Sequence, residues 1–89
     1  MGGLLQSAGN YPFNVFYEEN KTEAEINQFD TGIHNMYSGN ENVGNLQMIW
    51  CTLIVFKGAY EIVQIITAAK TIKIRAAYNG EWSEWKSII

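Results

Sequence analysis

The segment that decides the fold spans residues 70–86 and reads KTIKIRAAYNGEWSEWK. In its first half apolar residues occupy every second position and mostly polar residues lie between them, which predicts a β-strand with one apolar face. Asn79 and Gly80 follow, and these residue types best tolerate the positive φ angles of a type I′ turn. The returning strand carries two large aromatic anchors, Trp82 and Trp85. The segment therefore predicts a β-hairpin in which these four residues have structural roles.

Two further strands precede the hairpin. Residues 46–56 and 60–67 are rich in β-branched and apolar residues, and Lys57 and Gly58 mark a turn between them. A short turn at residues 68–69 leads into the hairpin. The chain from residue 45 onward therefore predicts a four-stranded antiparallel meander with short links.

The preceding residues predict smaller elements. Residues 32–37 indicate a short strand, and residues 38–45, rich in Gly and Asn, indicate a loop. Thr22 and Glu25 fit a capping box that starts a helix of at most two turns, with an irregular extended arm as the alternative. We therefore expect a mainly β fold, namely a small antiparallel β-sheet or β-sandwich of about four to six strands, with at most one short helix near residues 22–29.

The 89 residues are enough for one domain with a modest core. The first ten residues contain three glycines and no charge, and Pro12 limits the following segment to an edge strand or an extended arm. We therefore expect an N-terminal connector or arm over residues 1–20 and a β domain over residues 21–89.

Low charge points to self-association. Charged residues make up 17% of the chain, below the roughly 25% of an ordinary soluble domain. The continuous apolar character of residues 46–56 suggests burial on both faces, by the core and by another subunit or sheet. The alternative is a well-packed monomer with Asn, Ser and Thr on its surface.

Several partner classes are disfavoured. The net charge is −3 and the six basic residues are dispersed, so we expect no nucleic-acid binding. The apolar run of residues 48–56 is too short to span a bilayer as a helix, so we expect no membrane insertion. No signal peptide is visible at the start of the chain.

The sequence shows no catalytic constellation. One cysteine and one histidine cannot form a nitrogen or sulfur metal site within one chain, and a ring of His34 side chains around a threefold axis is the remaining alternative. Cys51 has apolar neighbours, which predicts a buried structural thiol. Glu81 and Glu84 would point to opposite faces of a strand. We therefore expect neither an enzyme nor a bound cofactor.

Five stretches together resemble the pyocin-knob domain found in tail fibres of bacteriophages and phage-tail-like bacteriocins. The resemblance covers about residues 24–88, and its closing pattern, I-R-x-x-x-N-G-x-W-S-x-W, is its most specific part. The stretches are DTGIHNMYSG at 30–39, TLIVF at 52–56, VQII at 63–66, KIR at 73–75 and YNGEWSEWK at 78–86.

The resemblance implies a non-enzymatic, knob-like module of a trimeric tail fibre, which supports or forms the host-receptor-binding tip. Its partners would be two further copies of the chain and a bacterial cell-surface glycan. It would act in a virion tail or phage-tail-like particle, assembled in the bacterial cytoplasm. The alternatives are a stand-alone carbohydrate-binding domain, in which Tyr60, Tyr78, Trp82 and Trp85 stack on sugar rings, and an architectural spacer.

Overall fold

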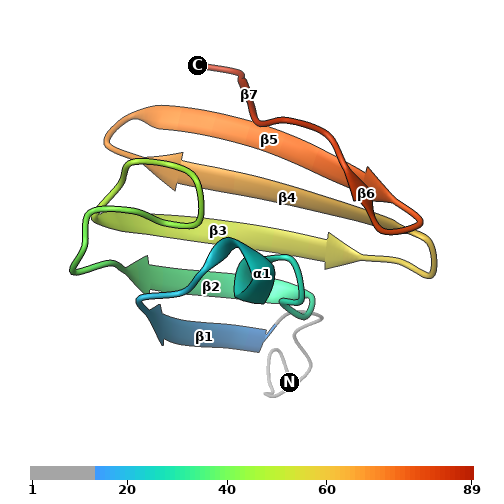
Figure 1. Ribbon diagram of the computed structural model, residues 1–89, viewed down its shortest axis with the longest axis horizontal. Coiled ribbons are helices and arrows are strands. Elements are labelled where there is room, and N and C mark those ends of the chain that lie inside the picture. Colours follow the sequence, from blue (N-terminus) through green and yellow to red (C-terminus); the bar gives the residue numbers. More distant parts are fainter. Residues whose placement is uncertain (1–13) are drawn as a thin grey trace, which may run out of the picture.

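The computed structural model describes residues 14–89, which form one seven-stranded sheet and one short helix (Figure 1). The protein is mainly β, as the sequence predicts. The elements are β1 (Asn14–Glu19), α1 (Glu23–Ile26), β2 (Gly32–Tyr37), β3 (Trp50–Lys57), β4 (Glu61–Ala68), β5 (Thr71–Tyr78), β6 (Glu81–Trp82) and β7 (Lys86–Ser87).

The strands follow one another across the sheet in chain order from β1 to β6, and β7 also pairs with β5. The neighbours from β2 to β5 are antiparallel, but β1 pairs with β2 in parallel. A parallel pair needs a crossover connection, which the segment containing α1 provides. The prediction of a small antiparallel sheet of about four to six strands is confirmed in its main features, and the structure adds this parallel pair and divides the last strand. Figure 1 shows β1 as the edge strand.

The predicted hairpin is present, and its turn has the expected backbone. Asn79 and Gly80 have φ angles of 52° and 85°, both in the left-handed region. The returning strand is interrupted, because residues 83–85 leave the ladder between β6 and β7. The preceding turn is centred on Ala69 and Lys70, with φ angles of 47° and 71°, one residue later than predicted.

The strand predicted at residues 46–56 begins only at Trp50. The preceding loop instead folds back on itself, where Met48 N–H donates to the Glu41 carbonyl at 3.0 Å. Leu46 and Met48 pack against the core from this loop. Their apolar character therefore reflects burial, although they are not in the strand.

The predicted capping box is present at the start of α1. Glu25 N–H donates to Thr22 Oγ1 at 3.3 Å, and Thr22 N–H donates to Glu25 Oε1 at 2.9 Å. The hydrogen bonds from the Thr22 backbone and side chain lower the pKa of Glu25. These bonds fix the entry of the short helix and direct Ile26 onto the sheet, where it is buried.

The core lies on one side of the sheet, under α1 and the loop of residues 38–49 (Figure 1). We call this side the covered face. Among residues 14–89 no element packs over the opposite side, which we call the open face, so the described fold is a single sheet rather than a sandwich. The buried cluster consists of Ile26, Met36, Val43, Cys51, Leu53, Val55 and Ile66.

Candidate functional site

The open face carries rows of apolar side chains across the sheet. Strand register aligns Ile33, Ile54, Ile65 and Ile74 on four neighbouring strands. We call this set the isoleucine row. A second row on the same face joins Phe56, Val63 and Ala76, and a third joins Asn35, Thr52, Thr67 and Ile72.

None of these three rows contains a charged residue. The isoleucine row is half-buried, and Trp50 and Phe56 are 62% and 43% exposed. Charges border these rows, because Lys86 pairs with Ile74 and Glu61 pairs with Tyr78 on the same face. An apolar surface with such a polar margin is typical of a protein–protein contact.

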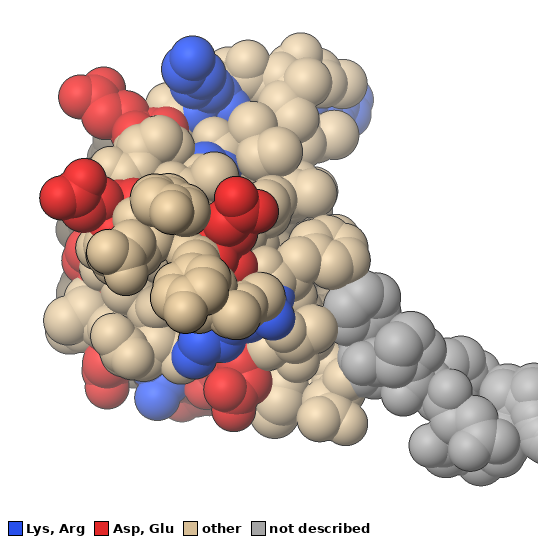
Figure 2. All heavy atoms as spheres, turned by 90° about the vertical axis from the view of Figure 1, so that its right-hand side faces the viewer, with Lys and Arg blue, Asp and Glu red and all other residues tan. Residues whose placement is uncertain are grey.

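Most charged side chains lie elsewhere. In the side view of Figure 2, most acidic residues lie toward the left and centre, and the left is the side on which α1 covers the sheet. The opposite side shows mainly uncharged atoms. Electrostatic repulsion therefore offers little to oppose contact through the open face.

The covered face, in contrast, buries three polar side chains that belong to strands: His34, Gln64 and Arg75. The apolar set of β5, which includes Ile72 and Ile74, points to the open face instead. A monomer would normally turn its apolar strand face toward its own core. The alternation of apolar and polar residues predicted for β5 is thus present, but its apolar residues lie on the open face rather than on the covered face.

Arg75 is the centre of a polar network that joins α1 to the sheet. Its Nε donates to Gln64 Oε1 at 2.9 Å, and its two terminal nitrogens donate to Glu23 Oε2 at 2.8 Å and Asn27 Oδ1 at 2.7 Å. Burial lowers the pKa of Arg75, and Glu23 partly offsets this shift. Because an arginine side chain does not deprotonate in proteins, it remains a cation.

Trp82 and Trp85 both stack on this guanidinium. The Arg75 Cζ atom lies 4.0 Å from the Trp82 ring centroid and 4.7 Å from that of Trp85. Both rings are half-buried, and Trp85 packs against the core cluster. One face of each indole ring contacts the Arg75 guanidinium in a cation–π interaction, which supports a structural role for both tryptophans.

Tyr60 and Tyr78, the other two candidate aromatics, lie at the turn end of β4 and β5. They are 70% and 65% exposed, and Asn79 N–H donates to the Tyr60 carbonyl at 2.7 Å. The four candidate aromatics therefore fall into two groups, an exposed tyrosine pair and a tryptophan pair held by Arg75. They do not form one continuous platform.

His34 is buried and has both ring nitrogens engaged. Nδ1 lies 3.0 Å from Glu18 Oε2, and Nε2 lies 2.9 Å from the Asp30 carbonyl oxygen. The ring stacks between Phe16 and Phe29, with centroid distances of 4.6 and 4.3 Å. It has no nitrogen left for a metal, so the alternative of a His34 ring around a threefold axis is wrong. Among residues 14–89 no three His, Cys, Asp or Glu side chains group around a point that could hold a metal ion.

Cys51 is buried in the core, as the sequence predicts. Burial raises the pKa of its thiol to about 11. Because the thiolate is the reactive form, this cysteine is not prepared to act as a nucleophile at neutral pH.

Trp50 is the exposed residue that sequence reasoning missed as a candidate. Its ring lies 4.6 Å from that of Tyr37, at an angle of 46°. It lines two clefts of about 710 and 680 Å³ on either side of the end of β3. The sequence placed Trp50 inside a strand buried on both faces, and only the strand register shows that it lies at an open margin.

Across the part of the chain that the structure describes, no helix is long and apolar enough to cross a membrane. Comparisons of the chain with protein-family models, with curated proteins and with solved structures find no match.

Proposed function

We propose that this domain is a non-enzymatic module of a multimeric tail fibre of a phage or phage-like particle, which self-associates through the open face. In that role it supports or forms the host-receptor-binding tip. The resemblance of the closing motif to pyocin-knob domains supplies the fibre context and the threefold symmetry. The observation that carries the proposal is the apolar open face, whose three central rows carry no charge.

The size of the open face suits a second copy of the chain. Five strands about 4.8 Å apart and about 26 Å long give a surface of about 600 Å² per copy, or about 1,200 Å² for two. A specific interface needs roughly 1,000 Å² in total. Two sheets also pack face to face about 10 Å apart with interdigitating side chains, which suits the isoleucine row.

Sedimentation of the purified domain from micromolar to millimolar concentration tests this proposal. We expect reversible association: to a trimer where three open faces pack around the threefold axis that the resemblance implies, and to a dimer where two open faces pack face to face. Substituting Ile65→Lys places a charge in the centre of the isoleucine row and should leave the domain monomeric, because an unpaired charge is costly to bury. The matched control, Gln28→Lys, adds the same charge at an exposed position beside α1.

Two outcomes would overturn the proposal. One is a wild-type domain that stays monomeric at the highest concentration. The other is an Ile65→Lys variant that associates as strongly as wild type while its circular dichroism shows an intact sheet.

Carbohydrate binding is the second candidate function, and the exposure of Tyr60 and Tyr78 favours it. Exposed aromatic rings offer flat apolar area for the C–H face of a sugar. Binding of host-cell glycans by the isolated domain, lost on Tyr60→Ala with Tyr78→Ala, would support this function. Absence of binding would favour the architectural spacer.

A further inference from the structure

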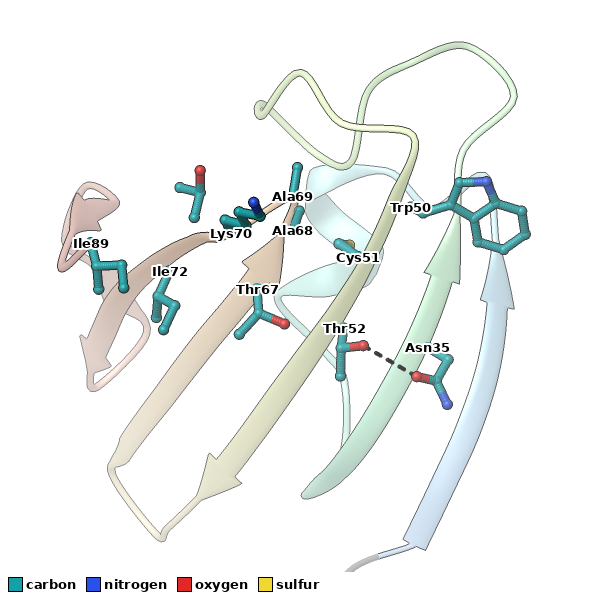
Figure 3. Close-up of a pocket in the computed structure, with 11 residues that line it drawn as sticks. Asn35, Trp50, Cys51, Thr52, Thr67, Ala68, Ala69, Lys70, Ile72 and Ile89 are labelled. Carbon is teal, nitrogen blue, oxygen red and sulfur yellow. Dashed lines mark hydrogen bonds between the residues drawn. The ribbon is translucent and has the colours of Figure 1, made fainter.

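A mixed polar and aromatic cleft lies at one end of the open face (Figure 3). Pairing of β3 with β4 ends at Thr52 and Thr67, and the cleft extends from this pair toward the turn at Ala69 and Lys70. The cleft has a volume of about 710 Å³ and is wide open to solvent. The third row of the open face lines the cleft, whereas the isoleucine row lies one row further along the strands and does not, so a bound ligand and a second copy of the chain would compete for the third row.

Trp50 supplies an aromatic surface beside this cleft. Its contact with Tyr37 restrains the indole, while 62% of the residue remains exposed. A ring that is both restrained and exposed loses little conformational freedom when a ligand stacks on it.

The polar groups of the cleft have unused hydrogen-bonding capacity. Thr52 Oγ1 donates to Asn35 Oδ1 at 3.3 Å, which leaves the Asn35 amide N–H groups without a partner among the described residues. The Thr67 hydroxyl likewise has none there. Figure 3 shows the Asn35 nitrogen directed away from Thr52.

Lys70 adds a positive charge. Within residues 14–89 no carboxylate lies at ion-pair distance from its ammonium group, and the cleft lining contains no Asp or Glu. The terminal carboxylate of Ile89, whose oxygen accepts from Ile72 N–H at 2.9 Å, also lies in the lining, so Lys70 is the cation that an anionic group on a ligand would meet.

We infer that this cleft binds a saccharide that carries a carboxylate, such as a uronic acid. The C–H face of the sugar ring stacks on Trp50, its hydroxyls bond to Asn35 and Thr67, and its carboxylate pairs with Lys70. This inference rests on the proposed receptor-binding role and names the ligand class. A nucleic-acid strand fits less well, because the chain has a net charge of −3 and the cleft has one cation.

The test is titration of the ¹⁵N-labelled domain with methyl β-glucuronide and methyl β-glucoside, which differ only in the carboxylate, followed by NMR. We expect saturable shifts at Asn35, Thr52, Thr67 and Lys70, with a Kd on the order of 1 mM for the glucuronide and weaker binding of the glucoside. A titration with dT8 tests the nucleic-acid class.

Substitutions assign the contacts. Lys70→Gln should remove the preference for the acidic sugar, whereas the control Lys86→Gln should retain it. Trp50→Ala should weaken both sugars by about tenfold or more, because stacking contributes to each. The dispersed NMR spectrum of each variant shows whether it is folded.

Three results would overturn the inference: no saturable shifts in the cleft, an unchanged acidic preference in Lys70→Gln, or stronger shifts with dT8. If the first result came with shifts confined to Tyr60 and Tyr78, the sugar site would instead lie at the turn end of β4 and β5. Repeating the titration on Ile65→Lys separates the two proposals, because this substitution targets association and lies outside the cleft lining.

Discussion

Cys51 occupies a position where burial controls ionisation. The pKa of its thiol rises from 9.0 to about 11 in the folded protein. Between these values the unfolded chain loses the thiol proton and the folded chain keeps it. The contribution of Cys51 to stability is therefore fully present below about pH 9 and is lost as pH rises through about 11.

We expect the native protein to react with iodoacetamide at pH 8 far more slowly than the urea-unfolded chain does, because the native thiolate is scarce and buried. Comparable labelling rates in the two states would contradict this. Urea denaturation gives the second readout. The free energy of unfolding of wild type should fall more steeply above pH 9 than that of Cys51→Ala, which lacks the titrating group and so controls for Tyr and Lys ionisation.

Residues differ in how well the sequence predicts their surroundings. The burial of Cys51 follows from its apolar neighbours in the chain. The burial of His34 does not, because its partners, Glu18 and Phe16, come from β1, sixteen and eighteen positions earlier. Only the parallel pairing of β1 with β2 brings them together, and nothing in the local pattern predicts that pairing.

At the scale of elements, the Arg75 network attaches α1 to the sheet. A helix of four residues cannot persist alone in water, so tertiary contacts must hold it. Arg75 provides them through Glu23 and Asn27 on the helix side and through Gln64 on β4. The stacked Trp82 and Trp85 exclude water from this network.

We expect Arg75→Lys to destabilise the domain by about 2–3 kcal/mol, although it keeps the charge. A lysine cannot bond three partners from a planar fork or stack in the same way, and Gln64 would be left buried without its donor. The measurement is the urea midpoint. Lys73→Met is the matched control on the same strand, where a single exposed hydrogen bond to Ser87 is lost. Similar midpoints for the two variants would show that the network contributes little.

Elements were predictable where local chemistry fixes them. The need for positive φ angles predicted the turn at Asn79 and Gly80, and the capping box predicted the start of α1. The structure has both. The first residue of β3 was not predictable, because Leu46 and Met48 are as apolar as the strand itself but pack from a loop. The apolar pattern of residues 46–49 indicates that these side chains are buried, but it does not distinguish a strand from a loop that folds over the same core.

At the scale of the whole molecule, the sheet has its polar network on the covered face and its isoleucine row on the open face. The sequence predicted an apolar strand with a second face to bury, and this is the basis of the proposed self-association. Which face remains open depends on the side that α1 and the loop of residues 38–49 cover, and local patterns do not encode this choice.

Self-association also makes thermal stability depend on concentration. An assembly that forms only from folded chains shifts unfolding by mass action, and partners at about a hundred times their Kd add about 2.7 kcal/mol. For a domain of this size that corresponds to a rise in Tm of about 10–20 °C.

We therefore expect the Tm of wild type to rise across about a hundredfold range of protein concentration, as measured by calorimetry, and the Tm of Ile65→Lys to stay constant. Gln28→Lys should follow wild type, because its added charge lies on the α1 side of the sheet. A wild-type Tm that is independent of concentration would mean that the domain is stable with its isoleucine row in water. The open face would then not be an interface between copies of this chain.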